Sequence, residues 1–205
     1  VLAGRPYHID SEINHGIPQM IAGYGLAGLS EDALPIEAYK DLSLRVNDQW
    51  VYHSRLYQAA EYVAKRNDLE LIQLNSFGCG LDAVTTDQVN EILEKHNKLY
   101  TVLKIDEVNN LGAARIRLRS LLAAMEMRKE QGIQAKTEPV SYQRAEFTKA
   151  MFQEGYTILA PQMSPIHFSI LKPIFQAYHF NIEVLDNDNR SAIDTGLRFV
   201  NNDAC

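Results

Sequence analysis

The sequence predicts an α/β protein built on a doubly wound parallel sheet of the Rossmann or flavodoxin type. Short segments that are apolar throughout alternate with longer segments whose apolar residues recur at helical spacing. Strands of this kind, alternating with helices, are typical of a parallel sheet that is covered on both faces. Hydrophobic residues make up 46% of the chain and charged residues 22%, so a core of normal size can be buried.

The first part of the chain, residues 1–131, is expected to follow the order β-α-β-α-α-β-α-β-α. We expect strands over residues 1–3, within 25–29, over 68–74 and over 100–105. We expect helices over residues 13–24, 49–66, 85–96 and 110–129, and a loop with a short helix over 31–47. The strand over 68–74 is predicted to be central, and the loop that follows it contains Cys79.

The remaining residues predict the start of a second, similar α/β unit. A polar segment with Pro139 predicts a linker over 132–141, and the second unit then runs over 142–205. In it we expect a helix over 142–153, a strand over 156–160, a helix over 167–177 and a strand over 181–185. Because the chain opens on a strand already under way and stops at Cys205 with no polar tail, we expect it to be a fragment whose second unit is truncated.

Composition excludes several classes of protein. The net charge is −6 and the isoelectric point about 5.5, which argues against a general nucleic-acid binder. No apolar run approaches the length of a membrane span, and no signal peptide is visible at the N-terminus. Two cysteines do not make a disulfide framework, so a reducing, cytoplasmic setting is expected.

Cys79 is the first candidate for chemistry. It lies between Gly78 and Gly80, after the predicted central strand, where the glycines let backbone amides approach a ligand. A thiolate there could bind a metal cluster or act as a nucleophile, and the alternative is a small buried cysteine in a tight turn. The chain has no CxxC or HExxH motif, so a cluster would need ligands from elsewhere.

Other candidates follow the ends of predicted strands. In the first strand-end loop, Arg5 could bind an anion and His8 could transfer a proton, or both could satisfy loop backbone groups. Asp106 ends a strand, and Arg117 follows on a helix whose arginines could equally form a solvated face. The glycines of 23–28 match GxGxxG but fall at the end of a helix, and no Walker or GxSxG motif is present.

Several longer segments carry a resemblance to a known family. The chain resembles a stretch of the large proteins related to 2-hydroxyacyl-CoA dehydratase activases, which fuse ATPase activator modules to a region similar to the dehydratase subunits. The segments that carry the resemblance are Gly4–Asp10, Asn14–Pro18, Ser76–Asp82, Lys104–Glu107 and Asn201–Cys205.

The resemblance implies a fold, a cofactor and site residues. Dehydratase-like α/β subdomains hold a 4Fe-4S cluster through cysteines, and Cys79 and Cys205 look like two of its ligands. Asp106 and Arg117 look like the acidic strand end and the helix arginine of those subunits, and with His8 they are the candidates for catalysis. In the family, an ATP-driven activator injects a low-potential electron into the cluster, which enables loss of water from a 2-hydroxyacyl-CoA.

The chain departs from the family in lacking an activator ATPase motif and the further cysteines of a full site. We therefore expect an iron–sulfur-binding, electron-accepting module that is inactive alone and lacks its cluster when isolated. Its expected partners are an activator ATPase, in the same chain or in trans, and an acyl-CoA. Two alternatives stay open: a non-catalytic module that docks the activator without metal, and a flavodoxin-like binder of a nucleotide or flavin, for which no phosphate loop is present.

Overall fold

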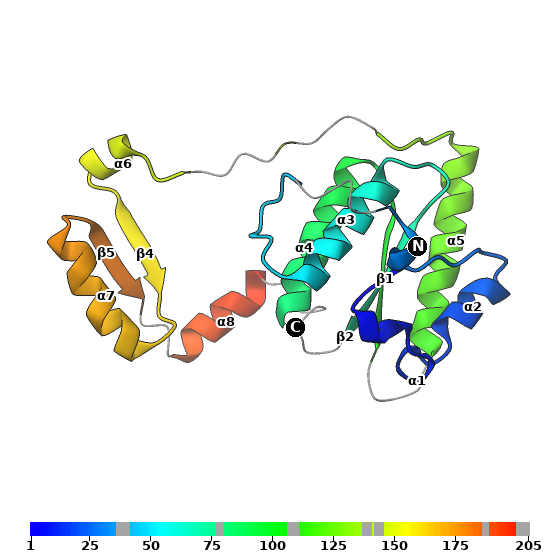
Figure 1. Ribbon diagram of the computed structural model, residues 1–205, viewed down its shortest axis with the longest axis horizontal. Helices are drawn as coiled ribbons and strands as arrows, with labels where there is room; N and C mark the ends of the chain where they lie inside the picture. The colour runs from blue at the N-terminus through cyan, green and yellow to red at the C-terminus, as the bar shows by residue number, and fades with distance from the viewer. Residues whose placement is uncertain are drawn as a thin grey trace. The chain divides into compact units, whose positions relative to one another are not determined.

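A computed structural model describes residues 1–35, 42–76, 80–105, 111–136, 141, 146–185 and 189–199. The chain forms two compact units, Val1–Gln143 and Arg144–Asn202, and each is described by itself (Figure 1). Both units are mixed α/β structures with parallel strands, which confirms the predicted fold class.

The first unit is built on a three-stranded parallel sheet in the order β1-β2-β3. Its strands are β1 (Leu2–Ala3), β2 (Leu71–Ser76) and β3 (Tyr100–Ile105). The register places Leu2 beside Ile72, and Ser76 beside Ile105 at the other end of β2. The strand predicted to be central is therefore central, and five of its six residues are buried, the polar residues Gln73 and Asn75 among them.

Helices cover both faces of this sheet. They are α1 (Ser11–Asn14), α2 (Ile17–Gly23), α3 (Val51–Ala64), α4 (Gly80–Lys95) and α5 (Gly112–Glu130), with short 3₁₀ segments η1 (Pro6–Ile9) and η2 (Glu31–Ala33). Residues of α3 and α4 pack around Leu71, whereas residues of α2 and α5 pack around Ile72 and Leu74. Successive strand residues point to opposite faces, so β2 contributes to both cores (Figure 1).

The segment after β1 differs from the prediction. A single helix over 13–24 is wrong, because His15 and Gly16 adopt left-handed backbone angles, with φ of 52° and 82°, and separate α1 from α2. Pro18 then lies in the first turn of α2, where its missing N–H leaves no hydrogen bond unmade. The strand expected within 25–29 is also wrong: the structure has an isolated bridge between Leu2 and Ser30 instead.

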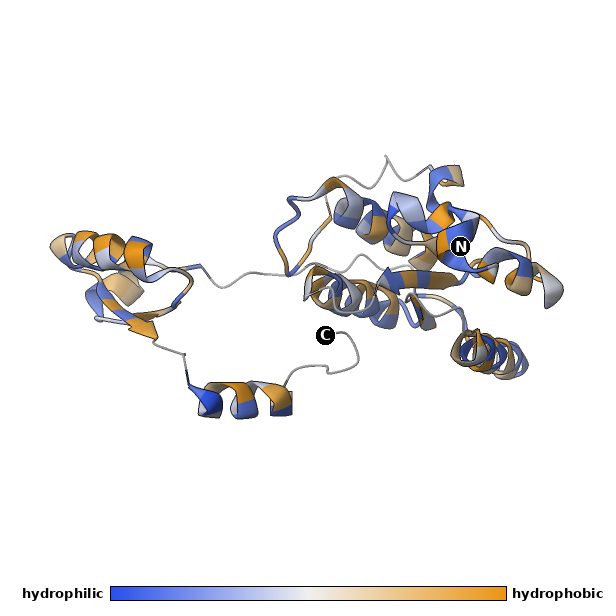
Figure 2. Cartoon of the chain, turned by 90° about the horizontal axis from the view of Figure 1, so that it is seen from below, coloured by the Kyte–Doolittle hydropathy of each residue, from blue (hydrophilic) through white to orange (hydrophobic). Residues whose placement is uncertain are grey.

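The second unit contains α6 (Lys149–Gln153), β4 (Thr157–Pro161), α7 (Pro165–Ala177), β5 (Asn181–Leu185) and α8 (Arg190–Phe199). Its two strands are parallel, with Thr157 beside Asn181. The expected strands and the helix between them are present, whereas α8 has no counterpart in the prediction. None of the described residues of this unit is fully buried. Figure 2 shows α7 in apolar colours along much of its length.

The two-sided packing of the first unit can be tested on α5. Leu118 lies in the core against β2, whereas Ile116 on the same helix is 68% exposed. Leu118→Ala is expected to lower the free energy of unfolding by about 3 kcal/mol, because it leaves a cavity in a packed core. Ile116→Ala is expected to change it by less than about 0.5 kcal/mol. Urea denaturation followed by circular dichroism measures both, and equal effects would contradict the packing.

Candidate functional site

Polar side chains gather where β1 and β2 end, at the carboxyl edge of the first sheet. In sheets of this class, ligands bind at that edge. The loop after β1 contributes Arg5 and His8, β2 ends at Ser76, and α4 begins at Gly80. Of the predicted site residues, His8 lies here. Cys79, Asp106 and Cys205 lie outside the described residues.

His8 is buried, with 2% of its surface exposed, and both its ring nitrogens are hydrogen-bonded. The backbone N–H of Arg5 donates to Nδ1 at 3.0 Å, so the neutral ring carries its proton on Nε2. Nε2 then donates to Ser76 Oγ at 3.2 Å. Burial lowers the pKa of His8 to about 4; the charge of Arg5 adds to the effect and that of Asp82 opposes it. At neutral pH the ring is a fixed, uncharged bridge between two strand ends.

The carboxylate of Asp82 joins the same strand ends from α4. It lies in the first turn of that helix and is 3% exposed. Oδ1 forms an ion pair with Arg5 Nη2 at 2.7 Å, and Oδ2 accepts from the backbone N–H of Ser76 at 3.3 Å. We call Arg5, His8, Ser76 and Asp82 the strand-end network. Ser76 and Asp82 stand on either side of residues 77–79, so the network ties both flanks of that segment to the loop after β1.

His53 of α3 adds a less satisfied group beside the network. Its Nε2 lies 4.0 Å from Asp82 Oδ1, and its ring packs 5.5 Å from that of Trp50. Both ring nitrogens are buried without a hydrogen-bond partner within the described part of the chain. Burial, followed by the charge of Arg5, lowers the pKa of His53. The neutral form of the His53 ring is therefore favoured, and the nearby Asp82 carboxylate is already paired with Arg5.

A second buried carboxylate, Glu31, supports the loop from the other side. Its Oε2 accepts from the backbone N–H of Gly4 at 3.3 Å, and its Oε1 lies 3.4 Å from Arg55 Nε. Burial raises the pKa of Glu31 to about 7, against the hydrogen bond from Gly4 and the charge of Arg55. The cavity between Gly4, His8 and Glu31 measures about 50 Å³. That volume holds a few water molecules and is too small for an organic substrate.

Asn14 fixes the shape of this loop. It is 2% exposed, and its Nδ2 donates to the carbonyl oxygens of His8 and Ile9, each at 3.2 Å. Its Oδ1 accepts from the N–H of Gly16 at 3.0 Å, next to the left-handed break between α1 and α2. The loop is thus closed by side-chain bonds to its own backbone.

Sequence reasoning located the first loop but missed its partners. The sequence does not single out Ser76, Asp82, Glu31 or His53 as site residues. Acidic residues are common in the first turn of a helix and are usually exposed there. Asp82 differs from such residues only in being buried against Arg5, which the sequence does not show. Arg117 is exposed on α5 and has no hydrogen bond or ion pair to the network. The described residues contain no group of three or more His, Cys, Asp or Glu that could hold a metal ion.

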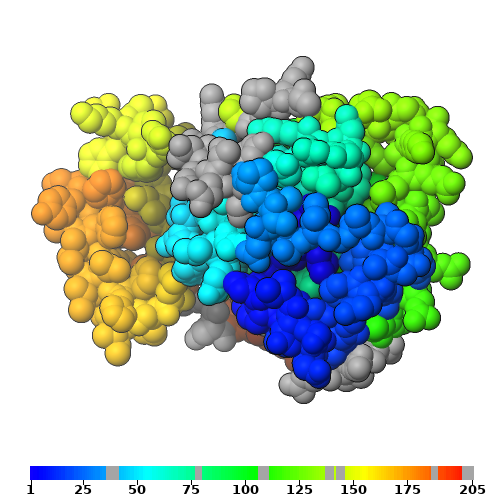
Figure 3. All heavy atoms as spheres, turned by 45° about the vertical axis from the view of Figure 1, so that its right-hand side comes forward, coloured from blue at the N-terminus to red at the C-terminus, as the bar shows by residue number. Residues whose placement is uncertain are grey.

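Comparison with known families finds one match. Residues 1–34 match the family model described as the CoA enzyme activase uncharacterised domain. The matched segment includes Arg5, His8, Asn14 and Glu31, and it is the blue surface at the front of Figure 3. This supports a relation to CoA-enzyme activases, and it does not extend to Ser76 or Cys79. The searches of curated proteins and of solved structures each found no match.

Within the ranges that the structure describes, the helices do not reach the combination of length and hydropathy that crossing a bilayer requires.

The close approach of His8 to Gly4 can be tested by adding one methyl group. A Cβ on Gly4 would lie 2.5 Å from His8 Nδ1, so the ring would have to leave its place. Gly4→Ala is expected to lower the free energy of unfolding by about 1–3 kcal/mol. Gly23→Ala is the control, because nothing lies within 4 Å of a Cβ there and its φ is negative. Thermal denaturation measures both, and a neutral Gly4→Ala would show that the ring is not held against Gly4.

His8 and Glu31 are expected to give opposite dependences of stability on pH. Below pH 6.5, His8 in the unfolded chain takes up a proton, whereas the folded ring accepts one only near pH 4. Acidification between these values therefore favours the unfolded state, and the free energy of unfolding falls. Above pH 4.5 unfolded Glu31 loses a proton that the folded carboxyl keeps to about pH 7, so its effect is lost as the pH rises.

Two variants separate these effects. Relative to the unaltered protein, Glu31→Gln is expected to gain roughly 2 kcal/mol of stability as the pH rises from 4.5 to 7. His8→Gln is expected to show a deficit that shrinks as the pH falls from 6.5 to 4. Chemical denaturation at a series of pH values measures both. Differences that stay constant with pH would overturn the assigned protonation states.

Proposed function

We propose that this chain is a module of a CoA-enzyme activase system whose Cys79 loop supplies a thiolate to a shared iron–sulfur cluster. The observation that carries the proposal is the strand-end network. It connects the family-matched loop, through Arg5 and His8, to Asp82 and Ser76, the two residues that flank the Cys79 segment. A loop that provides a cluster ligand needs fixed flanks, because surrounding hydrogen bonds orient the ligand.

The described residues do not form a cluster site by themselves. They contain no metal-binding group of three or more ligating side chains, and Cys79 and Cys205 lie outside them. Two thiolates do not complete a 4Fe-4S site, which takes four. The proposal therefore requires ligands from a partner or from another part of the polypeptide. When bound, such a cluster would supply one-electron redox chemistry, and the role of this chain would be to hold one ligand in place.

The remaining parts of the proposal concern partners. An ATP-driven activator, in the same polypeptide or in trans, would deliver the electron to the cluster. The electron would then enable the loss of water from a 2-hydroxyacyl-CoA. The relation of residues 1–34 to CoA-enzyme activases supports the activator in general terms. The resemblance of Ser76–Asp82 and Asn201–Cys205 to dehydratase-like proteins supports the specific reaction.

The second candidate is a docking module for the activator that works without metal. A specific feature of the second unit favours it: Ile166, Ile170 and Ile174 form an apolar stripe along α7, with 75%, 59% and 48% of their surfaces exposed. Exposed apolar stripes of this kind are common where one protein binds another. The two candidates differ in whether Cys79 is needed.

The cluster proposal predicts iron and sulfide in the full-length polypeptide, or in the complex of this chain with its partner, purified under strict anaerobiosis. Cys79→Ala is expected to reduce both by about tenfold, because a cluster that loses a thiolate ligand is released. Met127→Ala removes a sulfur-bearing side chain from an exposed position of α5 and is expected to retain them. Chemical analysis of iron and sulfide, with the absorption and electron paramagnetic resonance spectra, measures the effect. Absence of iron from the unaltered protein, combined with capture of the activator by both variants, would favour the docking module.

A further inference from the structure

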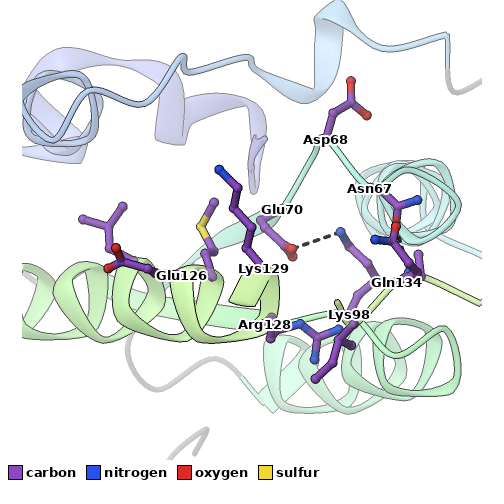
Figure 4. A pocket seen from close by; sticks show the side chains of 12 residues that line it. Asn67, Asp68, Glu70, Lys98, Glu126, Arg128, Lys129 and Gln134 are labelled. Atoms are coloured by element: carbon purple, nitrogen blue, oxygen red, sulfur yellow. Dashed lines mark hydrogen bonds and ion pairs between the residues drawn. The ribbon is translucent and has the colours of Figure 1, made fainter. Parts of the chain in front are cut away.

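A cavity of about 520 Å³ opens at the amino edge of the first sheet, opposite the strand-end network (Figure 4). It lies between the segment before β2, the turn before β3, the last turns of α5, and residues 133–135. Organic ligands of moderate size occupy cavities of roughly 300–1,000 Å³. This cavity is therefore large enough for an organic ligand, whereas the cavity in the loop at the carboxyl edge is not.

The charges at the cavity leave two cations available. The Lys98 ammonium donates to the carbonyls of Arg66 and Leu69, at 3.0 and 2.6 Å, and to Glu70 Oε1 at 3.0 Å, which uses its three protons. Asp68 is paired with Arg66. Of the remaining charged groups, Figure 4 shows Glu126 directed away from Glu70 and Lys98.

Arg128 and Lys129 supply those two cations, from the last turn of α5. Arg128 donates one N–H to the carbonyl of Asn97 and keeps its charge, while no described residue is bonded to the Lys129 ammonium. Basic residues at the end of a helix ordinarily offset its dipole. Both side chains line the cavity, but Figure 4 shows them directed to different sides of it, so the Lys129 ammonium is the cation that can bind a phosphate there.

The carboxylate of Glu70 lacks one partner. Its Oε1 accepts from Lys98, but its Oε2 is buried with no hydrogen-bond partner in the described part of the chain. A buried acceptor without a donor is costly, so a rotation of the carboxylate that brings this oxygen to the cavity wall, where a ligand hydroxyl can donate to it, is favourable. Carboxylates commonly accept hydrogen bonds from ribose hydroxyls.

The rest of the wall suits a flat heterocycle. Leu122, Met125 and Ile133 provide apolar surface, and thioethers such as that of Met125 contact aromatic rings favourably. The side-chain amides of Asn67 and Gln134 also face the cavity. Asn67 Oδ1 accepts from the N–H of Ala135 at 2.8 Å, which leaves its amide N–H groups to donate. Amides of this kind bind the edge of a purine.

From these features we infer that the cavity binds a purine nucleoside monophosphate. The phosphate lies against Lys129, a ribose hydroxyl donates to Glu70, and the base rests on the apolar wall. The site lies at the opposite edge of the sheet from Cys79 and does not depend on the proposed cluster.

Titration calorimetry with adenosine monophosphate tests this inference. The unaltered protein is expected to bind it with a dissociation constant below about 1 mM, since the ligand is small. Lys129→Ala is expected to weaken binding about tenfold, because it removes a charged contact without breaking any bond in the protein. Arg119→Ala, an exposed cation on the same helix outside the cavity, is the control and is expected to bind as before.

Two analogues test the other parts of the ligand. Inorganic phosphate alone is expected to bind more weakly than the nucleotide, and 2′,3′-dideoxyadenosine monophosphate is expected to lose affinity because it cannot donate to Glu70. Equal affinity for phosphate and nucleotide would reduce the site to one for small anions and overturn the inference. So would binding unchanged by Lys129→Ala, or no binding of adenosine monophosphate at about 5 mM.

Discussion

The ion pair between Arg5 and Asp82 is the interaction on which the carboxyl edge of the first sheet depends. Removing a carboxylate from water costs several kcal/mol unless donors replace the water, and here Arg5 and the Ser76 backbone do so. The pair joins residues 77 positions apart in the sequence. Loss of Arg5 would leave the buried Asp82 carboxylate without its counter-charge, at a cost of about 3–5 kcal/mol, whereas Arg5 is partly exposed and would lose less without Asp82. The loop, the strand end and the helix start are therefore held as one structure.

The loop after β1 is compact because Gly4 has no side chain. His8 occupies the space that a Cβ would take, and Glu31 accepts from the Gly4 backbone on the other side. Burial pushes both ionisable groups toward their neutral forms, so His8 is uncharged at neutral pH and Glu31, with a pKa of about 7, keeps its proton below that pH. A ligand at this edge must contact the outside of the loop, where Tyr7 is 43% exposed and hydrogen-bonded to Ser76.

The positions of β2 and β3 could be predicted from their apolar residues, although only β2 is almost wholly buried and β3 alternates between partly buried and buried residues over its first four positions. The break at His15 could not, since a left-handed histidine leaves no clear mark in the sequence and Asn14 stabilises the break through local side-chain bonds to the backbone of the same loop. The loop with His8 was identified by its position after a strand. Asp82 could not be predicted as a site residue, because it is buried against Arg5 and nothing in the sequence indicates a contact between residues so far apart.

The two edges of the sheet are linked by β2, which runs from just after Glu70 to Ser76. Five of its six residues are buried, and its register to β3 is continuous from Leu71 to Ser76. Coupling between distant sites requires an element with at least two arrangements, and the continuous register of β2 with β3 offers it no shifted pairing. A ligand that binds beside Glu70 would therefore leave the strand-end network in place. The cavity and the Cys79 loop should act as independent sites on a common rigid sheet, so that binding at the amino edge stabilises the first unit as a whole without altering the geometry at the carboxyl edge.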